Sequence, residues 1–271
     1  MIIHSLGRQS DLIFAEFGGE ILDRGNYTVI KTPSNPEYHW GNYIVFDQPP
    51  TKGCFKKWKS IFDQEFTYYQ QSHHYVFTWD STGDKQGYYR EFLEASFELD
   101  SAVVLTAERL HPPPYFRETP EFKLKKISDD SGWEDVIHLQ TLCADPRHLN
   151  KHYEAFKRNQ MSQYRAMSLA GMGHWFGAYI GDQLVADLGI FFKNSIARYQ
   201  NVGTHPKFRR QGICGSLVYQ AGLRAMEDFP VDTLVMEADA EYHAARIYES
   251  VGFRRCEENF ALSWWQGIGH H

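Results

Sequence analysis

The chain has 271 residues and a formal net charge of −6; 42% of its residues are hydrophobic and 23% are charged. This balance excludes collagen-like and disordered chains, and the length allows one large domain or two of average size. No apolar run reaches the roughly 18 residues that span a bilayer, and the acidic net charge argues against a general nucleic-acid binder.

The four cysteines lie far apart, and no two of them have CxxC spacing: they are Cys54, Cys143, Cys214 and Cys256. We therefore expect reduced thiols, no metal centre and a cytoplasmic protein. The first residues carry Arg8 and Asp11 and have no continuous apolar region, so they do not resemble a signal peptide.

In the first half, residues 42–106 follow the order strand, loop, helix, strand, helix and an apolar strand at 102–106. A proline cluster follows, in which Pro112, Pro113 and Pro114 favour an extended backbone without ladder hydrogen bonds. We predict a linker at 111–121, between a first domain at 1–110 and a second at 122–271. Residues 1–119 have a net charge of −5 and the rest −1, so an anion-binding site is expected in the second domain.

The second domain has the pattern of an antiparallel meander followed by a strand–loop–helix–strand crossover, which indicates a mixed α/β fold. Gly181-Asp182 and residues 193–195 are turn signals between apolar runs. Strands are expected at 122–127, 175–180, 184–192, 196–202 and 233–237, helices at 133–143, 153–169, 216–226 and 242–250, and two more strands around 254 and at 260–264.

The most informative segment is the loop between Val202 and Ser216, where a strand ends, basic residues follow and Gly212 and Gly215 open a helix. Free N–H groups at a helix N-terminus, close backbone approach at glycine and arginine side chains together favour a pyrophosphate. The P-loop and GxGxxG patterns are absent, although Glu237 lies about where a dinucleotide-binding acid would fall. A simple helix cap with a tight turn is the structural alternative.

Residues 209–215, Arg-Arg-Gln-Gly-Ile-Cys-Gly, resemble motif A of the GNAT superfamily of acyl-CoA-dependent N-acyltransferases, with Cys214 at a position usually held by Gly or Ala. Residues 244–253 resemble motif B, in which Ala244, Tyr248, Gly252 and Phe253 match and Glu241 replaces an asparagine. The resemblance covers roughly 122–265 and implies a GNAT fold.

The resemblance implies that acetyl-CoA is the co-substrate and lies in a V-shaped gap between two strands. The residues that would bind it are Val202, Gly203, Thr204, Arg209, Arg210, Gln211, Gly212, Ile213, Cys214, Gly215 and Ser216. Tyr248 would be the general acid that protonates the leaving thiolate, since a phenol has a pKa near ~10. Glu237 is the candidate general base, with Asp239 or a water chain as alternatives.

The first half can be aligned with the second as a degenerate GNAT-like repeat. The interval from Asn42 to Gly53 equals that from Asn201 to Gly212, and Phe92 falls at the position of Tyr248. Because phenylalanine has no proton to give, we predict that this copy binds no coenzyme and does no chemistry. An unrelated α/β domain with coincident spacing is the alternative.

The expected function is therefore acetyl transfer from acetyl-CoA to a primary amine of a small molecule or peptide, by direct attack in a ternary complex. No metal, nucleic acid or membrane is expected to take part, and the oligomeric state is open. The alternatives are an acyl-CoA-binding sensor or inactive module that acts through partners, and a nucleotide- or dinucleotide-binding enzyme.

Overall fold

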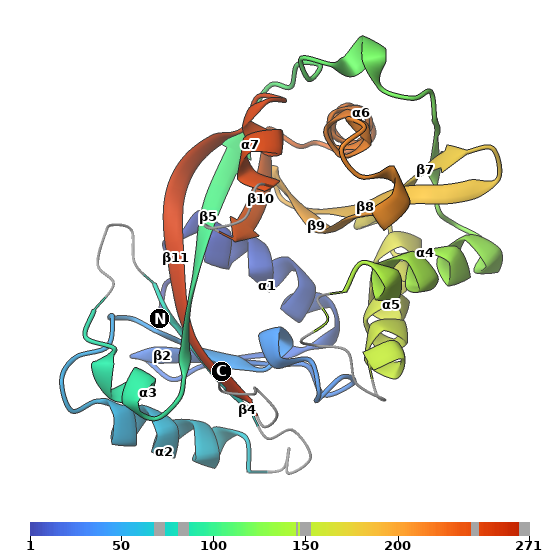
Figure 1. Cartoon of the computed structure of the whole chain (residues 1–271). Helices are drawn as coiled ribbons and strands as arrows, with labels where there is room; N and C mark the ends of the chain where they lie inside the picture. Colours follow the sequence, from blue (N-terminus) through green and yellow to red (C-terminus); the bar gives the residue numbers. More distant parts are fainter. Residues whose placement is uncertain (68–73, 81–86, 145, 147–152, 240–243, 266–271) are drawn as a thin grey trace. The chain divides into compact units, whose positions relative to one another are not determined.

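The structure, a computed structural model, describes residues 1–67, 74–80, 87–144, 146, 153–239 and 244–265. The chain divides into two units: unit 1 comprises residues 1–104 and 257–271, and unit 2 comprises residues 105–256. The strands β5 (Glu98–Ala107) and β11 (Arg254–Trp265) each begin in one unit and end in the other. Figure 1 labels the helices and strands where there is room.

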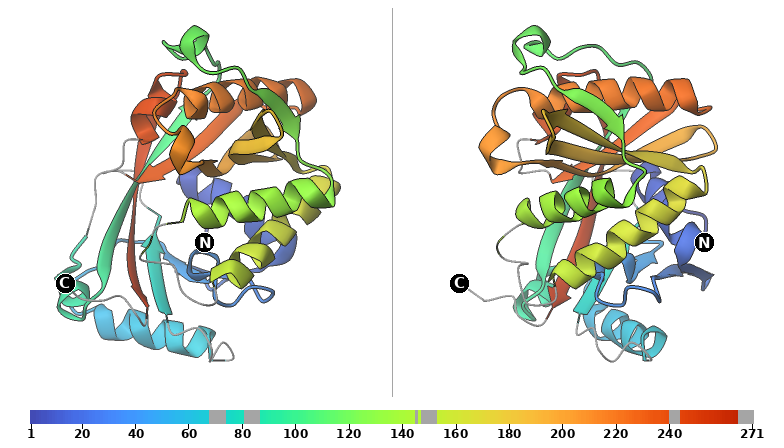
Figure 2. Two further views of the ribbon diagram at one scale, coloured as in Figure 1. Left: turned by 45° about the vertical axis from the view of Figure 1, so that its right-hand side comes forward. Right: turned by 90° about the vertical axis from the view of Figure 1, so that its right-hand side faces the viewer.

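Unit 2 is built on a sheet with the strand order β10-β9-β8-β7-β6. Its elements are η2 (Phe116–Glu118), β6 (Lys123–Lys126), α4 (Asp130–Leu142), α5 (Tyr153–Leu169), β7 (Gly173–Ile180), β8 (Gln183–Lys193), β9 (Ile196–Thr204), η4 (Pro206–Phe208), α6 (Ile213–Asp228), β10 (Thr233–Asp239) and α7 (Ala244–Glu249). β6 to β9 pair antiparallel, whereas β10 pairs parallel with β9. Helix α6 covers one face of β7–β9, and α4 and α5 cover the other (Figures 1 and 2).

Local sequence explains the corners of this unit. Gly181, in the turn between β7 and β8, has a φ of 60°, and Asn194 in the next turn has a φ of 54°. Both values lie in the left-handed region that glycine and asparagine adopt most readily. Helix α4 begins where the Asp129 side chain accepts a hydrogen bond from the Gly132 N–H.

Two irregularities shape the carboxyl end of β9. A β-bulge interrupts its pairing with β8, because Asp187 pairs with Gly203 and Gly189 with Gln200, so that two residues of β9 oppose Leu188 alone. The parallel pairing with β10 runs only from Thr233–Ile196 to Val235–Arg198 in the described part of the sheet. Residues 199–204 of β9 and 236–239 of β10 therefore lie beyond the part in which these two strands pair with each other.

Unit 1 contains the strand order β1-β2-β3-β4-β11. Its elements are α1 (Leu6–Gly18), β1 (Glu20–Asp23), β2 (Tyr27–Lys31), η1 (His39–Gly41), β3 (Tyr43–Phe46), α2 (Phe55–Glu65), β4 (His74–Trp79), α3 (Arg90–Glu94) and the unit 1 parts of β5 and β11. Its main core is aromatic: Trp58 stacks on Phe46 with 3.8 Å between ring centroids, and Phe92 is fully buried.

The two units share local geometry that supports the predicted repeat. The pairs β3–β4 and β9–β10 are both parallel, and Gly53 and Gly212 both have a positive φ before the following helix. After the next helix, the Phe97 N–H donates to the Phe92 carbonyl, just as the Phe253 N–H donates to that of Tyr248. The same turn therefore closes α3 and α7.

The predicted α/β fold class is confirmed, and so are the predicted helix at 153–169 and the meander. The prediction of two final strands was wrong, since β11 runs unbroken from Arg254 to Trp265 and pairs with β4. The predicted linker at 111–121 lies within unit 2, while residues 257–271 belong to unit 1. The division into a degenerate and a catalytic domain concerns function and stays a prediction.

Candidate functional site

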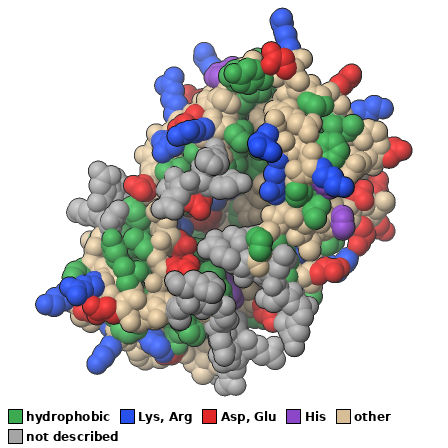
Figure 3. All heavy atoms as spheres, in the orientation of Figure 1, with side chains coloured by type: hydrophobic (Ala, Val, Ile, Leu, Met, Phe, Trp, Pro, Cys, Tyr) green, Lys and Arg blue, Asp and Glu red, His purple; other side chains and the backbone are tan. Residues whose placement is uncertain are grey.

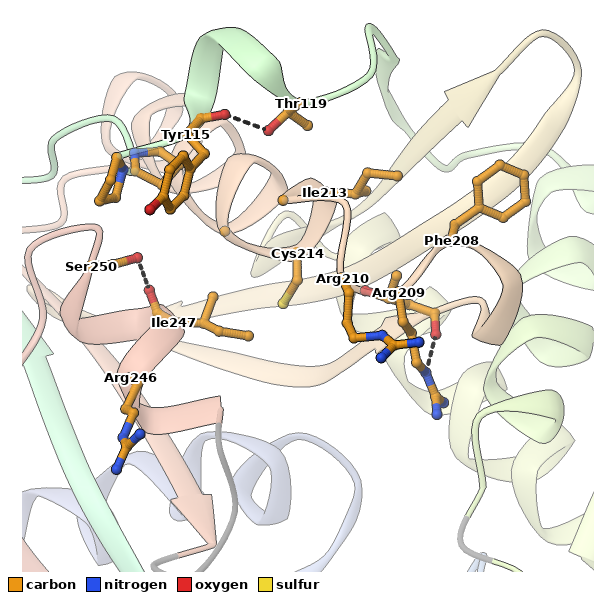
Figure 4. A pocket seen from close by; sticks show the side chains of 15 residues that line it. Tyr115, Thr119, Phe208, Arg209, Arg210, Ile213, Cys214, Arg246, Ile247 and Ser250 are labelled. Carbon is orange, nitrogen blue, oxygen red and sulfur yellow. Dashed lines mark hydrogen bonds between the residues drawn. The ribbon is translucent and has the colours of Figure 1, made fainter.

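A pocket of about 390 Å³ lies at the N-terminus of α6, entirely within unit 2 (Figure 4). Three segments form it: the loop from the end of β9 into the first turn of α6, helix α7 with the residue after it, and the proline-rich segment before β6. Its lining residues are Pro113, Pro114, Tyr115, Thr119, Thr204, Phe208, Arg209, Arg210, Gly212, Ile213, Cys214, Gly215, Arg246, Ile247 and Ser250. The wall is mainly apolar, and its charged side chains are arginines.

Gly212 determines how the loop enters the helix. It is the residue before α6 and has a φ of 77°, which glycine adopts without steric cost. A Cβ at this position would lie 2.4 Å from Thr119 Oγ1, so the proline-rich segment packs closely against the loop. The first N–H groups of α6 have no intrahelical acceptor, and the helix dipole adds partial positive charge there. This end of α6 is therefore suited to an anion.

Three guanidinium groups surround the pocket. Arg209 and Arg210 come from the loop, and Arg246 comes from α7 (Figure 4). Arg209 Nε donates to the Thr204 carbonyl at 3.1 Å, which ties the loop to the end of β9. On the face of the molecule shown in Figure 3, Lys and Arg side chains are interspersed with Asp and Glu. By contrast, the charged side chains that line the pocket are all arginines, so positive charge is concentrated there.

Cys214 occupies the position at which the motif usually has a smaller residue, and its side chain lines the pocket near Ile247 of α7 (Figure 4). Burial raises the pKa of its thiol to about 11. The thiol therefore stays protonated at neutral pH and acts as a small apolar part of the wall.

Glu237 forms an ion pair with Arg198 near the point where β9 and β10 separate. Arg198 Nη2 donates to Glu237 Oε2 at 2.9 Å, and the two side chains are 8% and 13% exposed. A guanidinium at this distance favours the ionised carboxylate and so weakens it as a proton acceptor. The ion pair counts against the predicted role of Glu237 as general base.

Tyr248 lies on α7 with 6% of its surface exposed, and its ring centroid is 6.4 Å from that of Phe253. Its neighbours Arg246 and Ile247 line the pocket, whereas Tyr248 itself is not among the lining residues. Helix α7 thus places the predicted general acid behind the pocket wall.

The predicted coenzyme residues separate into two groups. Thr204, Arg209, Arg210, Gly212, Ile213, Cys214 and Gly215 line the pocket, while Val202, Gly203, Gln211 and Ser216 do not. Ser216 Oγ donates to Thr119 Oγ1 at 3.2 Å, and Gln211 Nε2 donates to the Lys207 carbonyl. Glu241, where the motif has an asparagine, lies outside the described residues.

Sequence reasoning missed part of the lining: Pro113, Pro114, Tyr115, Thr119, Phe208, Arg246, Ile247 and Ser250. The proline-rich segment was interpreted only as a linker, although prolines also stiffen a pocket wall. Arg246 stands within the predicted motif B helix, two positions before Tyr248, and its charge was an available signal.

Two further searches concern the described residues. No group of three or more His, Cys, Asp or Glu side chains in them is placed to hold a metal ion. No helix in the described ranges has both the length and the apolar character needed to cross a membrane.

A family model described as an acetyltransferase (GNAT) domain matches residues 171–255. No curated protein matches the sequence. Solved structures do match, and two of them cover nearly all of both chains. A conserved protein of unknown function from Staphylococcus epidermidis ATCC 12228 is 15% identical with a TM-score of 0.74, covering 93% of this chain and 96% of that chain. A GCN5-related N-acetyltransferase from Kribbella flavida is 11% identical with a TM-score of 0.64, covering 97% and 95%.

A tandem GNAT protein from the clavulanic acid biosynthesis pathway is also similar, with 12% identity and a TM-score of 0.55 over 96% of this chain and 89% of that one. At such identities the likeness shows the fold alone, while the family model identifies the domain. The chain therefore contains an acetyltransferase (GNAT) domain over residues 171–255 and has the GNAT fold.

Proposed function

We propose that the protein is an acyl-CoA-dependent N-acyltransferase that moves an acetyl group from acetyl-CoA to a primary amine of a small molecule or peptide. One arrangement carries the proposal: the pocket at the N-terminus of α6 stands beside the separating ends of β9 and β10. An anion site next to an opening between two parallel strands suits a ligand with a phosphorylated end and an extended arm.

The residues of the pocket fit the phosphorylated end. The helix N-terminus behind Gly212 supplies N–H donors, and Arg209, Arg210 and Arg246 supply charge. The apolar part of the wall, with Tyr115 and Phe208, suits a flat ring system. Acetyl-CoA would supply an activated acyl group as a thioester.

Tyr248 is proposed to donate its hydroxyl proton to the departing thiolate while the amine nitrogen bonds to the acyl carbon. The amine must also lose a proton. Since Glu237 is held by Arg198, we assign that proton to water at the opening and give Glu237 a structural role across β9 and β10. The four free thiols fit a cytoplasmic setting for this activity.

A binding module that holds acyl-CoA without turnover is the second candidate. The observation that favours this candidate is the buried position of Tyr248, outside the pocket lining. Both candidates predict coenzyme binding, and only the first predicts thiol release.

Thermal unfolding with and without acetyl-CoA tests the binding step, with NAD and ATP as comparison ligands. A ligand at 100 times its dissociation constant adds about 2.7 kcal/mol to the stability of the state that binds it. We expect a shift with acetyl-CoA that persists in Tyr248→Phe and disappears in Gly212→Asp. Equal stabilisation by NAD or ATP, or none by any acyl-CoA, would contradict the proposal.

Coenzyme release in the presence of a panel of amines tests the chemical step. Loss of a general acid typically lowers the rate ~10²- to 10⁴-fold, so Tyr248→Phe should lower kcat by about that factor while acetyl-CoA still binds. Binding without release for any amine would favour the binding module.

A further inference from the structure

A buried polar cluster lies under the bulge of β9, on the side of the sheet covered by α4 and α5. It consists of Gln140, Lys157, Gln160, Asp187 and Asn201. The first four side chains belong to residues that are between 0% and 7% exposed. Burial of a lysine and an aspartate is costly unless both groups are hydrogen-bonded.

Asn201 is the centre of the cluster and has a φ of 48°, in the left-handed region. The bulge turns its carbonyl out of the ladder, and Gln140 Nε2 donates to that carbonyl at 2.7 Å. The Asn201 side chain is bonded as well, because its Nδ2 donates to Gln160 Oε1 at 3.0 Å. Two glutamines therefore hold the backbone and the side chain of the same bulged residue.

Each glutamine is oriented by a charged group. Lys157 Nζ donates to Gln160 Oε1 at 2.9 Å, and Gln140 Nε2 also donates to Asp187 Oδ1 at 2.8 Å. The second oxygen of Asp187 accepts from Trp175 Nε1 at 2.9 Å. Lys157 and Asp187 are thus linked to Asn201 through the side-chain amides of Gln160 and Gln140.

Gly203 allows β9 to lie close to the side chains of Asp187 and Gln140. It pairs with Asp187 across β8 and β9, and a Cβ there would lie 2.8 Å from Asp187 Oδ1 and 3.0 Å from Gln140 Nε2. The close approach of strand and carboxylate requires glycine at this position. Residues 202–204, which the family resemblance assigns to coenzyme binding, directly follow Asn201.

We propose that Lys157 and Asp187 are positioning residues for acyl transfer: through Gln160 and Gln140 they hold Asn201 in the bulged conformation that separates β9 from β10. The proposal rests on the proposed function for its catalytic part. Neither residue touches the reacting atoms, and both act by fixing the backbone on which the coenzyme arm would lie.

The electrostatic surroundings are consistent with this role. Burial raises the pKa of Asp187 to about 7 and lowers that of Lys157 to about 8. Other titratable groups also face the pair: Cys143 after α4, Tyr179 of β7 and, through Cys143, Arg209. Protonation of Asp187 below about pH 7 would remove the charge that orients Gln140. Deprotonation of Lys157 above about pH 8 would remove the charge that orients Gln160.

The test uses the full chain with Lys157→Met, Asp187→Asn and the double variant, which removes both charges together. Tyr164→Phe is the matched control, because Gln200 Nε2 donates to the Tyr164 hydroxyl at 2.8 Å one residue away from Asn201. Amide hydrogen exchange of residues 200–204 measures the bulge without any ligand. Acetyl-CoA affinity, kcat and the pH profile measure the effect on the reaction.

We expect exchange at 200–204 to rise at least tenfold in each single variant and to stay within threefold of wild type in the control. The acetyl-CoA dissociation constant should rise about tenfold and kcat should fall. In Asp187→Asn the pH profile of kcat should no longer show the fall in activity below about pH 7. Unchanged exchange in both single variants would overturn the proposal. Faster exchange with unchanged affinity, kcat and pH profile would overturn its catalytic part.

The two proposals fail in different ways. Wild-type protein that binds no acyl-CoA overturns the proposed function and with it the catalytic part of this inference, whatever the variants do. Wild-type protein that binds and transfers, beside single variants that match the Tyr164→Phe control in every readout, overturns the positioning role alone.

Discussion

At the scale of single residues, Gly212 combines a left-handed backbone with a close neighbour. Any residue with a Cβ loses about 1–2 kcal/mol in this conformation, and the new methyl group of Gly212→Ala would also lie 2.4 Å from Thr119 Oγ1. We expect the variant to lose about 2 kcal/mol of unfolding free energy and at least tenfold in acetyl-CoA affinity. Denaturant unfolding and ligand titration measure the two effects.

Gly215 supplies the matched control, because it lines the same pocket but lies within α6. A Cβ there would meet Ile247 Cγ2 at 3.4 Å and Pro113 at 3.5 Å, which are ordinary contacts. Gly215→Ala should keep or raise stability by about 0.5–1 kcal/mol, as alanine does in helices. If Gly215→Ala loses as much stability and acetyl-CoA affinity as Gly212→Ala, the pocket tolerates no added methyl group. The φ of Gly212 would then not be the cause of the loss.

The Arg198–Glu237 ion pair allows a structural role to be separated from a chemical one. Glu237→Gln removes one partner of this buried ion pair, and such losses typically cost about 3–5 kcal/mol. Replacing both partners, as in Arg198→Met with Glu237→Leu, should restore most of the stability. Because we assign Glu237 no proton transfer, the double variant should also regain kcat to within about tenfold.

Unfolding free energies and kcat for Arg198→Met, Glu237→Leu and the double variant form the cycle that checks this. Stability that returns without kcat would identify Glu237 as the general base after all. If neither the stability nor kcat returns in the double variant, the new side chains have changed how β9 and β10 pack.

At the scale of elements, the packing of α6 on β9 depends on Gly222. Tyr199 of β9 donates from its hydroxyl to the Val218 carbonyl at 2.9 Å, and a Cβ at Gly222 would lie 2.1 Å from that hydroxyl. Overpacking of this kind typically costs about 1–3 kcal/mol, so Gly222→Ala should destabilise unit 2 by about that amount.

Tyr199→Phe removes the oxygen that the new methyl group would meet. The double variant Gly222→Ala with Tyr199→Phe should therefore be more stable than Gly222→Ala alone, as measured by denaturant unfolding. A second clash remains, since the Cβ would also lie 2.4 Å from Leu110 Cδ1. Additive losses in the double variant would place the strain at Leu110 rather than at Tyr199.

Much of unit 2 could be predicted because its elements have local signals. The apolar spacing of 153–169 gives α5, and the turn residues Gly181 and Asn194 mark the corners of the meander. The loop into α6 was also predictable, because glycines and arginines carry their conformational freedom and charge in any context. The motif therefore located the loop side of the pocket, which is seven of its fifteen lining residues.

Features that depend on partners distant in sequence could not be predicted. The bulge at Asn201 has no local marker, because it is held by Gln140 and Gln160 from two other helices. The role of the proline-rich segment depends on its packing against Gly212, through Thr119. Likewise, the pairing of β11 with β4 joins residues nearly two hundred positions apart, so the final strand was split in two.

At the scale of the whole molecule, the two units differ at corresponding positions. In unit 1 the parallel pair β3–β4 stays closed to its end, where Phe46 pairs with Trp79 and the Asp80 N–H donates to the Phe46 carbonyl at 2.8 Å. In unit 2 the corresponding pair β9–β10 separates. In unit 1, Trp58 stacks on Phe46 at the end of β3.

The phosphate loop of unit 1 is altered as well. The Gly53 N–H corresponds to the N-terminal end of α6 that is proposed to bind an anion, and it donates to Glu91 Oε1 at 2.8 Å. A carboxylate at this place repels a phosphate and occupies a donor that the phosphate would need. Glu91 falls at the position that Ile247 holds in unit 2.

These differences predict one acetyl-CoA site for each chain. Calorimetric titration should give a stoichiometry near one, and Gly212→Asp should abolish all binding because no second site replaces the first. Phe92→Tyr, which restores the phenol at the repeated position, should add neither binding nor turnover, since Phe92 is fully buried beside Phe55 and Trp58. A stoichiometry near two, or binding that survives Gly212→Asp, would show that unit 1 holds coenzyme despite its closed strands and Glu91.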